Sequence, residues 1–153
     1  VELKADDEGD IVDFLCDLGK REPSVLGYHF PFYLQILSRI GVGTPLILGV
    51  RNSSGLTGLL PGIIRHSEAG TVYGSLPFFG HNGGCHCVDE GVKKCLLSGL
   101  IEILNQERRM LSASIVTPLF APDLEIYEKE LAPRFRACET NLITYNFNGS
   151  IWG

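Results

Sequence analysis

The sequence has no apolar run that approaches the length of a membrane-spanning helix, which is about 20 residues. Its first residues are acidic, whereas a signal peptide begins with a basic region. Lys and Arg form no stripe or cluster on which nucleic acid phosphates or an anionic membrane would bind. We therefore expect neither a transmembrane segment nor specific DNA binding.

Acidic residues are concentrated at the start of the chain. Five of the first ten residues are Asp or Glu and one is Lys, a local sum of −5 + 1 = −4 within a net charge of −5. We expect residues 1–9 to form a flexible, solvated acidic segment without a chemical role.

The cysteines do not form the dense, even-numbered framework of a small secreted protein. There are five of them, Cys16, Cys85, Cys87, Cys95 and Cys138. An odd, sparse set is typical of a reducing compartment. We predict reduced thiols and a cytoplasmic location, and we expect Cys16, Cys95 and Cys138 to be packing residues.

The length of 153 residues, with 44% hydrophobic content, fits one domain over residues 10–153. The chain begins with Val1, so we expect it to be an excised part of a longer protein.

Hydrophobic periodicity and turn residues predict alternating helical and extended segments. The predicted helices cover residues 10–19, 30–40, 88–104 and 122–131, and the predicted strands cover residues 46–51, 56–65, 71–77, 111–116 and 141–147. Pro61 predicts a bulge, an edge or an end in the second strand. This order predicts an α/β (α+β) domain with one mixed sheet. Three antiparallel strands come first, helix-strand-helix-strand follows, and helices cover both faces.

Three short motifs carry a family resemblance. They are His29-Phe30-Pro31-Phe32-Tyr33, then Gly58-Leu59-Leu60-Pro61, and then Ser75-Leu76-Pro77-Phe78-Phe79-Gly80 leading to Asn82-Gly83-Gly84. Together with the element order they resemble the GNAT (acyl-CoA N-acyltransferase) superfamily, and within it the N-terminal half of FemAB-type acyltransferases.

This resemblance implies transfer of an acyl or aminoacyl group to a small-molecule or peptide-like amine acceptor. It also implies a second GNAT-like domain as partner. Acyl-CoA or aminoacyl-tRNA would be the donor of the full protein. The stretch Phe79–Gly84 lacks the donor-phosphate signature Gln/Arg-x-x-Gly-x-Gly/Ala, so we expect no cofactor to be bound by this half alone.

The segment Gly80–Gly84 is the strongest candidate ligand contact. Glycines before a helix leave backbone amides open to a ligand, and the helix N-terminus favours an anion. The expected substrate-binding residues are this loop, the strand before it and the start of the second helix: His29, Phe30, Tyr33, Tyr73, Ser75, Phe78, Phe79, Gly80, His81, Asn82, Gly83 and Gly84. The alternative is a tight connection in which the glycines only allow the chain to turn.

Metal binding and nucleophilic catalysis are two other roles to weigh for this region. His81, Cys85, His86 and Cys87 include metal-ligand types, but zinc needs about four converging ligands and this spacing is poor, so we expect no metal. Cys85 or Cys87 near the start of the long helix would be a nucleophile if its thiol pKa were lowered.

No catalytic residue can be assigned from the sequence. Besides the acyltransferase half, a self-sufficient CoA-dependent N-acetyltransferase and a non-catalytic binding or interaction domain remain as alternatives.

Overall fold

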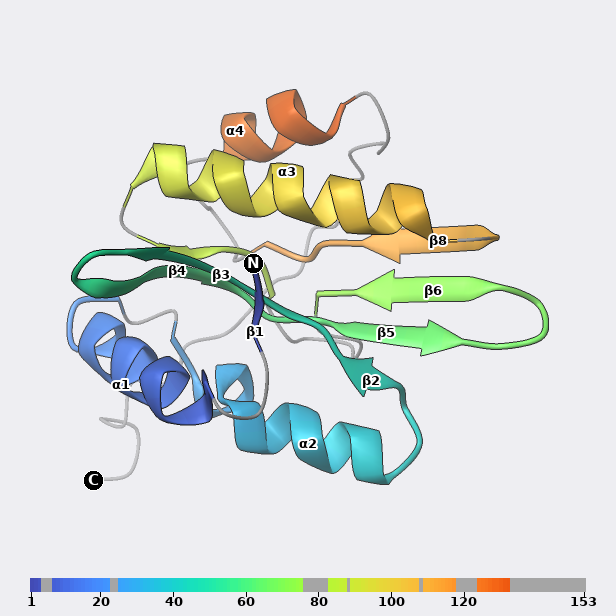
Figure 1. Cartoon of the computed structure of the whole chain (residues 1–153), viewed down its shortest axis with the longest axis horizontal. Helices are drawn as coiled ribbons and strands as arrows, with labels where there is room; N and C mark the ends of the chain where they lie inside the picture. Colours follow the sequence, from blue (N-terminus) through green and yellow to red (C-terminus); the bar gives the residue numbers. More distant parts are fainter. Residues whose placement is uncertain are drawn as a thin grey trace, which may run out of the picture.

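The computed structural model describes residues 1–3, 7–22, 25–75, 83–87, 89–107, 109–117 and 124–132. The predicted strand at 141–147 lies outside these ranges. The described elements form three layers, with α1 and α2 on one face of the strands and α3 and α4 on the other (Figure 1). The helices are α1 (Glu8–Gly19), η2 (Gly27–His29), α2 (Pro31–Arg39), α3 (Glu90–Gln106) and α4 (Leu124–Leu131). Among the helices in these ranges, none is long and apolar enough to cross a membrane.

The strands form two four-stranded sheets. The first has the order β1 (Glu2–Leu3), β3 (Ile47–Asn52), β4 (Gly55–Leu60) and β7 (His86–Cys87). The second has the order β2 (Thr44–Pro45), β5 (Ile63–His66), β6 (Thr71–Gly74) and β8 (Met110–Ser114). All described pairs are antiparallel except β6 and β8, which are parallel. The predicted α+β class is confirmed.

We expected one sheet that begins with three antiparallel strands. This was wrong because the second of these strands is divided between two sheets. The predicted strand 56–65 divides at Pro61 and Gly62 into β4, which pairs with β3, and β5, which pairs with β2 and β6. The Leu46 N–H donates to the Gly62 carbonyl at 2.8 Å, so one long bent hairpin links the sheets. A Cβ on Gly62 would lie 2.5 Å from the Tyr73 hydroxyl, so a larger residue would not fit at the bend.

The N-terminal segment also differs from the expectation of a flexible tail. Glu2 and Leu3 form β1 against β3, and Leu3 is buried. Arg51 binds Asp7 at 2.7 Å and Asp10 at 2.6 Å, joining the start of α1 to β3. The helix begins at Glu8 rather than at Asp10. The acidic side chains thus pair with a cation that is distant in sequence, which local composition does not reveal.

The core lies between α3 and the strands. Leu96, Leu100 and Leu104 of α3 pack with Leu60 and Tyr73, as the three- and four-residue spacing predicts. Asp89 caps α3, because its carboxylate accepts the Val92 N–H at 3.0 Å. Leu97 packs instead against α4.

Two cysteines expected in the core are not there. Cys16 of α1 and Cys95 of α3 are exposed, and Cys138 lies outside the described residues. Cys16 and Cys95 are each adjacent in sequence to a buried leucine. Each cysteine nevertheless lies on a different face of its helix from that leucine.

Leu100→Ala tests the core. Leu100 has no exposed surface, so the substitution leaves a cavity and should lower the free energy of unfolding by about 2–5 kcal/mol. The matched control is Leu111→Ala, because Leu111 is 58% exposed. Loss of that exposed side chain should cost at most about 0.5 kcal/mol. Urea denaturation measures both, and equal effects would contradict the core as described.

Candidate functional site

The candidate site lies where two parallel strands end. β6 and β8 run side by side until Gly74 pairs with Ser114, and α3 lies between them in sequence. In open α/β sheets, ligands bind beyond the carboxyl ends of parallel strands. The predicted glycine loop begins at this end of β6.

The same loop leaves and rejoins one edge of the bent hairpin. β6 ends with Gly74 opposite Ile63, and β7 begins with His86 opposite Leu59. Residues 60–62 lie between these two pairings, so the pairing on this edge of the hairpin is interrupted at the bend. The hairpin thereby brings the loop's two ends together.

Ser75 and Gly83 tie the two strand ends together. Ser75 is fully buried, its N–H donates to the Ser114 carbonyl at 3.0 Å, and its Oγ accepts the Val116 N–H at 3.0 Å. The Gly83 N–H donates to the Val116 carbonyl at 2.7 Å. Both backbone groups of Val116 are therefore satisfied within the chain.

Gly83 and Gly84 have a packing role. A Cβ on Gly83 would lie 2.3 Å from Ser75 Oγ. Gly84 has a φ of +119°, and a Cβ on Gly84 would lie 3.0 Å from the Tyr127 hydroxyl. For these two positions the geometry favours the tight-connection alternative, because a side chain at either would disturb the core.

Tyr127 of α4 closes the end of the loop. Its hydroxyl accepts the Cys85 N–H at 2.7 Å, and the Lys93 ammonium lies 5.1 Å from the centre of its ring. Lys93 is only 6% exposed, and it comes from the first turns of α3. The loop, α3 and α4 therefore meet at one buried polar cluster.

The thiols of this cluster do not have the properties of a nucleophile. Burial raises the pKa of the Cys85 thiol to about 12, and burial also raises the pKa of Cys87. Burial likewise raises the pKa of Tyr127. An activated cysteine needs a lowered pKa, so the thiol-nucleophile alternative is not supported.

Two histidines meet on the opposite face of β7. The rings of His29 and His86 have centroids 4.2 Å apart, and His29 Nδ1 accepts the Leu26 N–H at 2.9 Å. His86 is 7% exposed, and its buried Nε2 has no hydrogen-bond partner among the residues that the structure describes. Burial lowers the pKa of His86 to about 3, and the charges of His29 and Lys93 act in the same direction. His86 is therefore neutral at physiological pH.

The His29–His86 contact brings the start of the second helix next to the end of the glycine loop. Phe30 and Tyr33 are half-buried there. Tyr73 instead lies in the α3-side core, where its hydroxyl has no partner among the described residues. The remaining predicted residues, Phe78, Phe79, Gly80, His81 and Asn82, lie outside the described residues. His86 was not among the expected substrate-binding residues; strand alternation between Cys85 and Cys87 was the available signal that its side chain lies on the other face of the strand.

Two open cavities are found elsewhere, and none of the predicted substrate-binding residues lines either of them. One of about 370 Å³ lies between α1 and β4, lined by Asp10, Asp13, Phe14, Asp17, Leu18, Arg21, Leu56 and Thr57. The other, of about 450 Å³, lies beyond the end of α2 and is lined by Ser38, Gly41, Gly43, Thr44, Ile64, Arg65 and His66. In the described part of the chain, no three His, Cys, Asp or Glu side chains converge as metal ligands.

Comparison with known proteins gives one informative match. No protein-family model and no curated protein sequence matches this chain. A solved structure, a possible acetyltransferase from Clostridium difficile 630, is similar with a TM-score of 0.59 and 12% identity over 95% of each chain. At this identity the match shows the fold alone: the chain has an acetyltransferase-like fold.

The buried neutral His86 predicts an acid-sensitive stability. The unfolded chain binds a proton near the ordinary His pKa of 6.5, whereas the folded chain does so only near 3. The stability from neutral His86 is therefore complete above pH 6.5 and is lost as the pH falls from 6.5 toward 3. It should decrease by about 2–3 kcal/mol between pH 7 and 4.5.

Urea unfolding at both pH values measures this loss. His86→Gln should show a smaller fall in stability than the unsubstituted chain, and His66→Gln, which removes a more exposed imidazole, should retain the fall. An unchanged pH dependence in His86→Gln would show that His86 is not buried as described.

Thiol alkylation provides a second check. With iodoacetamide at about pH 8, Cys85 should react at least about 100-fold more slowly than exposed Cys16 and Cys95, because burial suppresses its thiolate. Peptide mass spectrometry follows each site, and urea should equalise the rates. Rapid labelling of Cys85 in the folded chain would contradict the described cluster.

Proposed function

We propose that this chain is an acyltransferase domain that helps to bind an amine acceptor or an acyl donor beyond the carboxyl ends of β6 and β8. The observation that carries the proposal is the parallel β6–β8 pair, with α3 between the strands in sequence, in a fold similar to that of a possible acetyltransferase. Acyl transfer can be accelerated by orienting two substrates and stabilising the charge of the intermediate. It therefore does not require the activated thiol that Cys85 fails to provide.

His86 is the described side chain best suited to orient such a ligand. Within the described part of the chain its buried Nε2 lacks a hydrogen-bond partner, and buried polar atoms are seldom left unpaired. A neutral imidazole can accept the N–H of an amine or donate to a carbonyl oxygen. The ring also contacts His29, so a ligand bound to His86 would lie beside the start of α2.

The complete enzyme has two candidate arrangements. The sequence motifs support a FemAB-type half, in which a second GNAT-like domain completes the site and the donor is acyl-CoA or aminoacyl-tRNA. The 95% coverage of both chains supports a self-sufficient N-acetyltransferase that uses acetyl-CoA, because the similar protein has nearly the same extent.

Calorimetry with acetyl-CoA distinguishes the arrangements. A self-sufficient enzyme should bind acetyl-CoA with a Kd of about 1–100 µM and release free thiol when a primary amine is added. A FemAB-type half should bind and react only when the second domain is supplied. A chain that binds no acyl donor in either form is a non-catalytic domain, which would refute the proposal.

Ser114→Trp tests the location. Ser114 is exposed at the end of β8 opposite Gly74, so an indole there should weaken donor binding at least about tenfold while the melting temperature stays within a few degrees. Ser98→Trp, on the exposed face of α3, is the control and should bind normally. Normal binding by Ser114→Trp would place the site elsewhere.

A further inference from the structure

The outer face of α2 carries large apolar side chains that are exposed to solvent. Phe32 is 53% exposed, Ile36 is 48% exposed and Ile40, which follows the helix, is 67% exposed. Residues four apart lie on one side of a helix, so the three form a single stripe. The inward side of α2 is occupied separately by Pro31, Leu34 and Leu37, which are buried.

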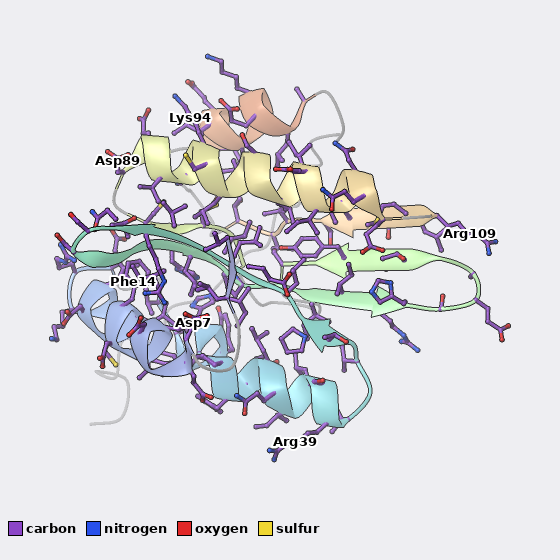
Figure 2. All side chains as sticks on the ribbon, in the orientation of Figure 1. Asp7, Phe14, Arg39, Asp89, Lys94 and Arg109 are labelled. Atoms are coloured by element: carbon purple, nitrogen blue, oxygen red, sulfur yellow. The ribbon has the colours of Figure 1, made fainter. Side chains whose placement is uncertain are left out.

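None of the described elements covers this stripe. α2 packs against η2, α1 and β2, and it lies with α1 in the outer layer on one side of the strands (Figure 1). Arg39 extends from its C-terminal end away from the strands (Figure 2). Apolar side chains gathered in one exposed patch are typical of a protein–protein contact.

We propose that this stripe is the centre of an interface with a second copy of the chain, in which the two α2 helices cross antiparallel about a two-fold axis at Ile36. Such an axis places residue 36 + n of one copy opposite residue 36 − n of the other copy. Ile36 then faces Ile36, and Phe32 lies level with Ile40 of the second copy. The stripe is therefore complementary to itself, as an isologous interface requires.

The charges of α2 are compatible with this arrangement. Arg39 is the sole charged residue of the helix, and no described residue forms an ion pair with it. The two-fold axis puts Arg39 level with Tyr33 of the second copy and close to Phe32, where a guanidinium can lie against an aromatic ring. Measured along the helices, the two Arg39 residues are six positions apart, a distance of about 9 Å, so they do not meet.

The size of the patch sets the expected affinity. Helix α2 has nine residues. A helix of this length extends only about 13 Å. A standard interface buries about 800 Å² on each partner, so the stripe supplies the apolar centre and only part of this area. We therefore expect a weak dimer, with a Kd of about 10–500 µM.

Sedimentation equilibrium of the full chain, from about 5 µM to 1 mM, tests the proposal. Ile36→Glu places two carboxylates together on the axis and should raise the dimer Kd at least about tenfold. Ser98→Glu adds the same charge to α3, on the opposite layer, and should dimerise like the unsubstituted chain. Ile36 is half-exposed, so circular dichroism melting should show both variants folded.

A dimer that Ile36→Glu abolishes and Ser98→Glu preserves supports the proposal. A chain that is monomeric throughout this range overturns it, and such a result would mean that the stripe is covered within the chain or by a different protein. A dimer that Ile36→Glu leaves intact also overturns it, because another surface would then form the contact.

Discussion

The bend at Pro61 and Gly62 determines how the rest of the described chain is arranged. It divides one long hairpin between two sheets, while the bond from Leu46 to Gly62 keeps the halves joined. Proline lacks a backbone donor and glycine lacks a side chain, so the pair interrupts strand pairing and leaves room for the Tyr73 ring. β6 and β7 pair with the hairpin on either side of the interruption. The ends of β6 and β8, the start of α3 and the histidine pair are all positioned as a result.

Burial controls the chemistry available next to this bend. It raises the pKa of the Cys85 and Cys87 thiols and lowers that of His86, so each of these groups is neutral near pH 7. Neutral groups in a dry site orient and hydrogen-bond a ligand; they do not supply an anionic nucleophile. This agrees with a proposed reaction in which the protein aligns an acyl group with an amine and the amine itself attacks. Lys93 is a buried basic residue nearby, and its Nζ lies over the Tyr127 ring.

Local patterns predicted the elements that have local causes. The helices α1, α2 and α3 follow from apolar spacing and from the proline at the start of α2, and the turns after β3 and β5 follow from their Gly and Ser residues. β1 and β7 were not predicted, because strands of two residues have no periodicity and exist only through pairing with β3 and β4. Pro61 was recognised as an irregularity, but its effect on sheet membership depends on distant strands. For the site, the substrate-binding role of the helix start and of the loop stays a prediction; the structure shows that His29 contacts His86, which follows the loop. The role proposed for His86 rests on its burial and on an Nε2 without a partner among the described residues, which are tertiary properties.

The proposed ligand site lies at the carboxyl ends of β6 and β8. Its location can be measured from the amide chemical shifts of the isotope-labelled chain, titrated with acetyl-CoA and with the second domain if the chain alone does not bind. We expect the largest shifts on Ser75, Gly83, His86 and residues 114–116. Shifts confined to residues 10–21 or to residues 38–44 and 64–66, which line the two open cavities, would contradict it.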